Sequence, residues 1–476
     1  MIPSDPFPAS DASRAGHPRR LVRVRDTGSG RVRPIEPRVP NRIGIYACGP
    51  TVYSPIHVGN ARPFVVYSLL RRFLVHEGYD VVLVINITDI NDKVYAAARA
   101  AGVSSPVWAD RMTDAYVRDT DRLGLGRPDH EPRASQSVDR MICLITRLIE
   151  SGHAYIANGD VYFHVRSHPM YGEISHRDVD EMEGEGLESA HHKHDPLDFA
   201  LWKAQKPGED TAWESPWGRG RPGWHIECSA MGEEILGLGF AIHGGGSDLV
   251  FPHHENEAAQ TRAARGEPLA KLWMHNGMIR LHDAKMAKSA GNILSLRVAL
   301  DRYGRDALIM YLCGAHYRQP IDFGDAQLRQ ASARVRRLQE LRHHVTEASS
   351  PDWSAPLRER FFTALADDFN TPRALAAVFD WVTQANRRRG AGAADLREML
   401  DVLGLANLLQ SGALAIPDDV LALARFREQA RARGDFTTAD RIRAELHARG
   451  WEPRDHPDGT ELVAFADVEA APSTDA

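Results

Sequence analysis

One loop in the first quarter of the chain carries side chains that could bind the phosphates of a nucleotide. His57 and Asn60 lie three positions apart, directly before a run with helical pattern, and both can donate hydrogen bonds to phosphate oxygens. Gly59 lies between them, and a glycine lets the backbone approach a phosphate closely at a helix N-terminus. The loop therefore indicates phosphate binding, with a histidine that merely caps a helix as the alternative.

A second candidate phosphate site lies much later in the sequence. Lys285 and Lys288 are three positions apart, followed by Ser289 and Gly291. Two such lysines can neutralise the charge that develops on a leaving pyrophosphate. A solvated basic loop would look the same. The two loops favour nucleotide chemistry together, because they fall near the start and near the end of one α/β region.

Side chains from three distant segments form a candidate metal site, made of Cys48, Cys228, His253 and Glu257. On a helix, His253 and Glu257 lie one turn apart on the same face, so both can reach one ion, and two cysteines would complete a tetrahedral zinc shell. The sequence lacks the His-Glu-x-x-His helix of zinc hydrolases. Two buried cysteines beside a polar helix start would account for the same residues without a metal.

The elements that position these residues follow an α/β pattern. A short apolar strand over 43–48 is followed by a breaker-rich loop and a helical run over about 61–78, and the next strand covers 81–85. Alternation of this kind predicts a Rossmann-like, doubly wound parallel sheet. Ligands bind such sheets at the carboxyl ends of the strands, where both Cys48 and Asp89 fall, although no role can be assigned to Asp89.

The pattern changes several times along the chain and predicts more than one domain. A segment at about 119–222 contains mixed helices and short strands and is interpreted as an insertion, and the region from 327 is almost entirely amphipathic helix. The predicted units are a disordered N-terminus over 1–20, a catalytic domain over 21–326 with an insertion at about 119–222, a helical bundle over 327–416, a small C-terminal domain over 417–466 and a disordered tail over 467–476.

Composition fits a soluble enzyme. The 476 residues include 43% hydrophobic and 26% charged side chains, and no window approaches the roughly 20 apolar residues of a membrane span. The first residues have no apolar core typical of a secretory signal, so we expect a cytoplasmic protein. Four cysteines are too few and too dispersed for a disulfide framework, and the apolar runs around Cys143 and Cys313 predict core positions for these two.

The two phosphate loops together resemble the HIGH and KMSKS signatures of class I aminoacyl-tRNA synthetases. Asn60 replaces the last histidine of the first signature and Ala287 the middle serine of the second, but His57, Lys285 and Lys288 are present. From about Arg42 to Leu462 the chain resembles the cysteinyl-tRNA synthetases. The most specific matching runs are 46–53, 86–90, 223–231 and 245–257.

This resemblance implies a set of roles. It implies that Cys48, Cys228, His253 and Glu257 bind one zinc ion, and that the thiolate of the substrate cysteine coordinates the same ion. His57, Asn60, Lys285 and Lys288 would act on the phosphates of ATP, which enters with Mg²⁺. The remaining residues of the nucleotide and substrate pocket would be Thr51, Gly59, Trp224 beside the adenylate, His243 near the adenine and Asp248 on the ribose.

The implied reaction joins L-cysteine to its tRNA in two steps through cysteinyl-adenylate. Because zinc prefers a thiolate to a serine hydroxyl, we expect no editing domain. The helical domain would follow the tRNA backbone, and the Arg-rich terminal domain would read the anticodon, with Trp451 and Arg454 as candidates for stacking. The resemblance also implies a monomer.

Two other functions remain open at this stage. A ligase that joins cysteine to an aminosugar would share the zinc site and both phosphate loops but would lack the terminal domain. A non-catalytic tRNA-binding relative would be expected to have lost phosphate or metal residues, and His57, Lys288 and the four candidate ligands are all present.

Overall fold

The structure is a computed structural model. It describes residues 19–182, 192–281, 284–285, 294–388, 390–410, 418–449, 451–456 and 459–464. Among these residues, no helix is both long and apolar enough to cross a membrane.

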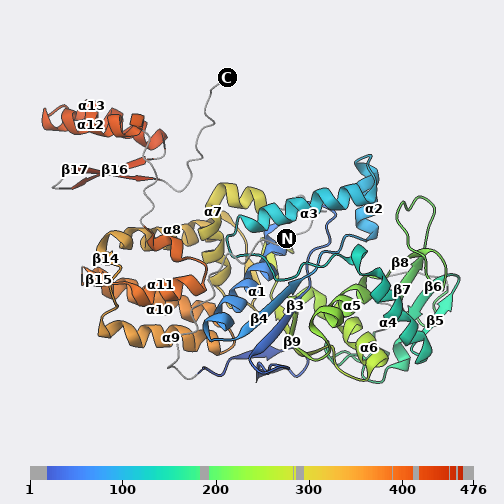
Figure 1. The fold of residues 1–476 in the computed structure, drawn as a ribbon. Helices are drawn as coiled ribbons and strands as arrows, with labels where there is room; N and C mark the ends of the chain where they lie inside the picture. Colours follow the sequence, from blue (N-terminus) through green and yellow to red (C-terminus); the bar gives the residue numbers. More distant parts are fainter. Residues whose placement is uncertain are drawn as a thin grey trace, which may run out of the picture.

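A parallel sheet of four strands forms the centre of the molecule (Figure 1). Its strands, in spatial order, are β10 (Ala270–Asn276), β9 (Phe240–Gly246), β3 (Arg42–Ala47) and β4 (Asp80–Ile85). The helix α1 (Val58–His76) connects β3 to β4 and buries an apolar face against the sheet. The predicted Rossmann-like α/β core is therefore confirmed, with the strand over 43–48 and the helix over 61–78 found within a few residues of their expected limits.

Further elements surround this sheet. The hairpin β1 (Arg23–Asp26) and β2 (Arg31–Pro34) packs beside β10. The remaining helices and strands of this part are α2 (Asp92–Ala100), α3 (Ser105–Asp121), α5 (Trp224–Leu236), α6 (Glu255–Arg265), β11 (Ile279–Leu281), β12 (Ala284–Lys285), α7 (Leu296–Cys313) and β13 (Ile321–Asp322).

The predicted insertion begins along the edge of the central sheet. Isolated bridges join Val84 to His130 and Ile87 to Arg133, so the chain extends the sheet beyond β4 before it leaves it. The insertion then forms a separate antiparallel sheet, seen at the right of Figure 1. Its elements are α4 (Val138–Glu150), β5 (Ala154–Ala157), β6 (Asp160–Phe163), β7 (Phe199–Ala204) and β8 (Gly220–Pro222).

A bundle of helices follows the α/β core, as the amphipathic pattern predicted. In α8 (Asp325–Leu341) the buried residues recur at helical spacing, which gives one apolar stripe that faces the other helices. The other elements are β14 (Val345–Thr346), α9 (Ala355–Ala366), α10 (Thr371–Asn386), β15 (Ala391–Gly392) and α11 (Ala394–Val402).

The terminal unit stands apart from this bundle at the upper left of Figure 1. It contains α12 (Asp418–Ala432), α13 (Phe436–Ala448), β16 (Trp451–His456) and β17 (Gly459–Ala464). Trp451 is only 7% exposed because it packs with Val420, Ile442 and Leu446 in a small core. The expected stacking of Trp451 on anticodon bases is therefore wrong, and this side chain has a packing role.

Burial also corrects one of the two cysteine predictions. Cys313 is buried, as expected, whereas Cys143 is exposed. The buried face of α4 consists of Val138, Met141, Leu144, Ile145 and Leu148. Cys143 lies on the opposite face of that helix, so its apolar neighbours in sequence are not its neighbours in space.

Candidate metal and nucleotide site

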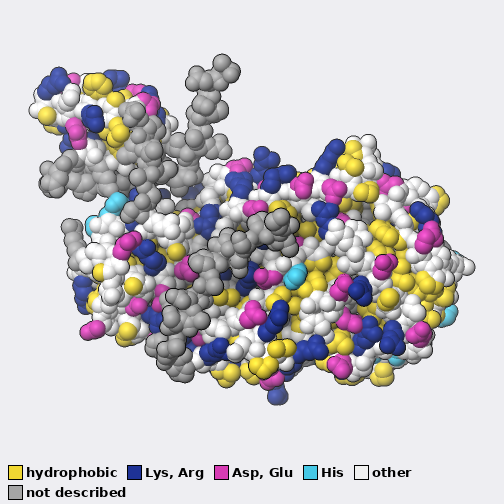
Figure 2. All heavy atoms as spheres, viewed as in Figure 1, with side chains coloured by type: hydrophobic (Ala, Val, Ile, Leu, Met, Phe, Trp, Pro, Cys, Tyr) yellow, Lys and Arg dark blue, Asp and Glu magenta, His cyan; other side chains and the backbone are white. Residues whose placement is uncertain are grey.

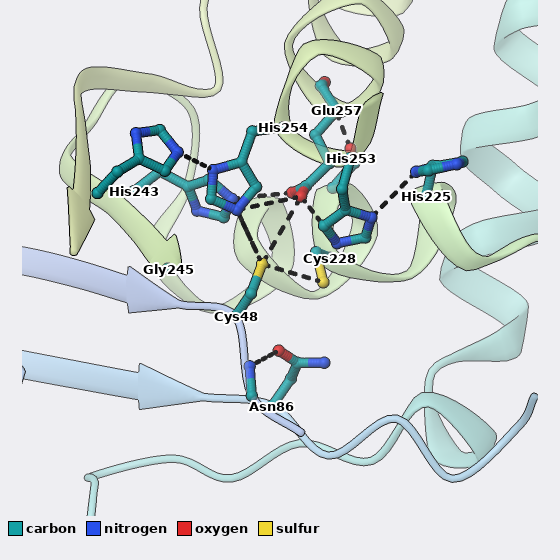
Figure 3. Close-up of polar contacts among 12 residues, drawn as sticks. Cys48, Asn86, His225, Cys228, His243, Gly245, His253, His254 and Glu257 are labelled. Atoms are coloured by element: carbon teal, nitrogen blue, oxygen red, sulfur yellow. Dashed lines mark hydrogen bonds and ion pairs between the residues drawn. The ribbon is translucent and has the colours of Figure 1, made fainter. Parts of the chain in front are cut away.

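The four predicted metal donors converge beyond the carboxyl end of β3 (Figure 3). Cys48 directly follows β3 and Cys228 lies in the first part of α5. His253 belongs to a short irregular turn, Val250–His254, that precedes α6, and Glu257 lies in the first turn of α6. Their donor atoms all lie within 4.8 Å of one another.

The distances between these donor atoms fit a tetrahedral ion. In a tetrahedron with bonds of about 2.0–2.3 Å the donors lie roughly 3.3–3.8 Å apart. Cys48 Sγ is 3.6 Å from Cys228 Sγ and 3.7 Å from Glu257 Oε1. His253 Nε2 is 3.1 Å from Glu257 Oε1. Two thiols, an imidazole and a carboxylate of this spacing match the preferences of zinc.

Burial disfavours the charged forms of these four side chains unless a cation is bound beside them. All four are at most 8% exposed. Burial raises the pKa of the Cys48 thiol and of the Glu257 carboxyl well above their ordinary values, and it lowers the pKa of His253. A dication would lower the pKa values of Cys48 and Glu257 again, because it stabilises thiolate and carboxylate. The donor set therefore fits a bound metal better than an apolar core.

Two further histidines lie in the same cluster, and the sequence did not predict this position for either. His254 Nε2 is 3.3 Å from Cys48 Sγ, and His243 Nε2 is 2.9 Å from Glu257 Oε2. Cys48, His243, His254 and Glu257 thus form a second group whose spacing could hold an ion. The only sequence signal was the His253–His254 pair, and it did not say which ring turns inward.

His243 was expected near the adenine, but its ring is enclosed by protein. It is fully buried and contacts the rings of Tyr46, His254 and Trp273 at centroid distances of 5.0, 4.6 and 4.6 Å. Burial lowers the pKa of His243 to about 3, so the ring is neutral. These contacts place His243 with the metal donors and leave no exposed ring face for a base.

The side of the cluster nearest solvent is formed by Trp224. Its ring stacks on His253 with centroids 4.0 Å apart, and 36% of the residue is exposed. His225 Nδ1 lies 3.0 Å from His253 Nδ1, which leaves Nε2 of His253 directed at the donors. A hydrogen-bonded partner on the second ring nitrogen is what orients histidine ligands in metal sites.

The first phosphate loop lies at the N-terminus of α1. His57 precedes the helix, and its backbone N–H donates to Asn60 Oδ1 at 3.2 Å. A Cβ at Gly59 would lie 2.7 Å from His57 Cε1, so a larger residue at this position would displace the His57 ring. Leu294 and Leu296 pair with the backbone on either side of His57, so the chain that follows the second phosphate loop lies beside the first loop.

The lysines themselves are described only in part. The backbone of Lys285 belongs to β12 and pairs with Arg280 of β11. Its side chain and all of Lys288 lie outside what the structure describes. Asp248 is exposed just after β9, and Thr51 is half-buried and bridges to Thr88, so both lie along the carboxyl edge of the sheet.

Asp89 receives a structural role. Its carboxylate accepts hydrogen bonds from the backbone N–H of Ser135 at 2.9 Å and from Ser135 Oγ at 2.6 Å. These bonds join the loop after β4 to the start of the insertion. The sequence had placed Asp89 at a strand end but could not show that its partner lay 46 residues away.

The chain matches the family model described as tRNA synthetases class I (C) catalytic domain over residues 34–333, and a DALR domain over 360–408. The protein belongs to the class I tRNA synthetases. Curated cysteine–tRNA ligases are similar over almost their whole length. Those of Halorhodospira halophila and Alkalilimnicola ehrlichii are each 45% identical, with 92% of this chain and 99% of the relative covered. That of Caldicellulosiruptor saccharolyticus is 40% identical over 90% and 96%.

Solved synthetase structures share the fold at low identity. The methionyl-tRNA synthetase of Mycobacterium tuberculosis in complex with methionyl-adenylate aligns with a TM-score of 0.55 at 16% identity, over 77% of this chain and 90% of that one. LeuRS of Agrobacterium radiobacter K84 aligns with a TM-score of 0.57 at 12% identity, over 79% and 85%. Together these matches show that this synthetase has the class I catalytic fold.

Proposed function

We propose that this synthetase is a cysteine–tRNA ligase, which activates L-cysteine with ATP and transfers it to the terminal adenosine of its tRNA. The observation that carries the proposal is the convergence of Cys48, Cys228, His253 and Glu257 beside the phosphate loop of a class I fold. The identity of 40–45% to cysteine–tRNA ligases supports it.

A zinc ion held by these four side chains would supply an electrophile that binds thiolate far better than the serine hydroxyl. Trp224 would line the opening through which the amino acid reaches this position, since its ring lies on His253 and is partly exposed. An apolar pocket discriminates similar side chains by only about 1–3 kcal/mol, and enzymes that rely on one often need an editing step. Selection by zinc would remove that need.

The phosphate chemistry would fall to the carboxyl edge of the sheet. The cysteine carboxylate attacks the α-phosphorus of ATP, and pyrophosphate leaves. His57, Asn60 and Gly59 would hold phosphates at the N-terminus of α1, while Lys285 and Lys288 would neutralise charge on the leaving pyrophosphate. Thr51 and Asp248 would contact the nucleotide, and Mg²⁺ would accompany ATP. Positioning and charge neutralisation are the main sources of rate enhancement in such a reaction.

The helical bundle and the terminal unit would bind tRNA. On the face shown in Figure 2, Lys and Arg side chains are interspersed with Asp and Glu, so tRNA would meet separate basic positions there. In the terminal unit, Phe426 and Phe436 are 60% and 61% exposed and have arginines near them in sequence. They are better candidates than Trp451 for stacking on unpaired anticodon bases. We further propose a cytoplasmic monomer, with the domain limits given by the sequence.

Cysteine-dependent exchange of labelled pyrophosphate into ATP tests the first step. The zinc-loaded protein should exchange with cysteine and not with serine, and Cys228→Ser should lose both zinc and exchange. Charging assays with tRNA and with an aminosugar then identify the acceptor. Absence of exchange with metal-loaded wild-type protein would overturn the ligase and favour a non-catalytic tRNA-binding relative.

A further inference from the structure

Residues 250–257, called the metal-binding turn below, include two buried residues that contribute no donor to the cluster. Glu255 and Asn256 lie between His253 and Glu257, and they are at most 1% exposed. A carboxylate removed from water carries a large free-energy cost unless hydrogen bonds or an opposite charge compensate it. Glu255 must therefore be held by partners on the side of α6 that faces away from the donors.

Those partners belong to the insertion. Glu255 Oε1 accepts a hydrogen bond from the backbone N–H of Gly172 at 2.8 Å. Its Oε2 accepts from the N–H groups of Ile174 at 3.0 Å and Ser175 at 2.7 Å. Burial raises the pKa of Glu255, and the three backbone donors offset part of that effect and fix the position of the carboxylate.

The same segment contacts the rest of this turn. Tyr171 Oη donates to Asn256 Oδ1 at 2.5 Å. The Arg177 guanidinium lies 4.4 Å from the centre of the ring of Phe251, which precedes His253 in the same turn. Residues 171–177, called the clamp segment below, therefore hold the chain both before and after His253.

The clamp segment has a backbone that only particular residues allow. Gly172 has a φ of +103°, and a Cβ there would lie 2.1 Å from the Arg177 carbonyl oxygen. The tight turn presents the N–H groups of three residues on one side, toward Glu255. Because a backbone amide has no rotamers, such a turn is a stiff partner for a carboxylate.

We propose that the clamp segment fixes the metal-binding turn, and that Glu255 is the positioning residue through which the insertion controls zinc retention and the affinity for the substrate thiol. Glu255 lies between two of the metal ligands in sequence, so displacement of its side chain would move both. Metal sites tolerate only about 0.5 Å of misplacement. The part that concerns the thiol rests on the proposed function, whereas the part that concerns zinc does not.

The test compares Glu255→Gln with wild type in the full-length, zinc-loaded protein. The variant keeps the size of the side chain but removes its charge and turns an amide NH₂ toward backbone donors. Zinc release to a chromogenic chelator should become about 10- to 100-fold faster, because loss of a residue that supports metal ligands lowers the metal affinity by about that factor. In pyrophosphate exchange the KM for cysteine should rise while the KM for ATP stays constant.

Two further variants keep the test decisive. Tyr171→Phe removes only the hydroxyl and should change zinc release in the same direction but less, and it decides the question if Glu255→Gln does not fold. Glu233→Gln is the control. It removes the ion pair between Glu233 Oε1 and Arg265 Nη2, which are 2.8 Å apart at the far end of α6, and it should leave the rate of zinc release unchanged. Release at the wild-type rate from folded Glu255→Gln, or equal acceleration in Glu233→Gln, would overturn the clamp. Zinc release to the chelator can be measured without enzymatic activity, so this test remains valid even if pyrophosphate exchange is absent.

Discussion

The metal cluster and the phosphate loop lie along the same edge of the central sheet, yet the protein encloses them to different degrees. The four metal donors are at most 8% exposed. On the nucleotide side, His57 is half-buried, and Asn60 and Asp248 are exposed. The donors are thus in place before any ligand arrives, whereas the described residues of the phosphate side are partly or fully exposed to solvent.

This difference follows from what each region must recognise. Metal coordination depends on the positions of the donor atoms. Side chains that are already ordered by folding lose less free energy when the metal and substrate bind. Triphosphate is large and highly charged, and pyrophosphate must leave after each activation. An open region with a helix N-terminus can attract and release such a group. The comparison predicts that changes in the cluster affect selection, while changes in the loop affect rate.

The largest expected effect comes from removing a cluster donor. Cys48→Ser should lose zinc and all measurable cysteine activation, because a hydroxyl is a poor zinc ligand and the remaining buried donors would hold protons instead. Zinc content by atomic absorption and binding of ATP by calorimetry provide the two readouts. ATP binding should be retained, and its loss would mean that the two regions are not separable.

A large but incomplete loss is expected in the phosphate loop. His57→Ala removes one donor from the developing charge and should lower kcat for exchange by about 100- to 1,000-fold. Zinc content and the KM for cysteine should remain as in wild type. Steady-state exchange kinetics at saturating ATP measure this, and a shift confined to the KM for cysteine would contradict the division of roles.

Zinc binding should release protons to solvent, because burial favours the protonated forms of the thiol donors. Burial raises the pKa of Cys48, and the pKa of Cys228 is raised because burial and the nearby Glu257 outweigh its hydrogen bond with Cys48, so both thiols are protonated at neutral pH and must lose protons when zinc binds. We expect at least two protons released per ion, one from each thiol, and an apparent zinc affinity that increases with pH. Calorimetry in two buffers of different ionisation enthalpy gives the number of protons, and the absence of proton release would show that the donors are already charged.

The smallest effect is expected for Cys143, which lies on the exposed face of α4. Cys143→Ser should leave zinc content, exchange and thermal stability unchanged, within about 0.5 kcal/mol in the free energy of unfolding. It is the matched control for Cys48→Ser. A loss of zinc in this variant would show that thiols outside the cluster affect the metal indirectly.

The sequence alone predicted the class of fold and the four side chains that converge in the cluster. Alternating apolar strands and helices predicted the parallel sheet, and β3 and α1 lie within three residues of their expected starts. His253 and Glu257 were predicted to share a helix face, and the structure brings them together with Cys48 and Cys228. These predictions succeeded because they rest on local periodicity and on residue types with few alternative uses.

Only the tertiary structure decided which side chains face inward and what surrounds them. It buried Trp451, exposed Cys143, enclosed His243 and His254 with the metal donors, and joined Glu255 to the insertion. A helix or strand has two faces, and an apolar neighbourhood in sequence does not determine which face meets the core. The partners of Glu255 are backbone N–H groups about 80 residues earlier in the chain, and backbone amides carry no signal in the sequence.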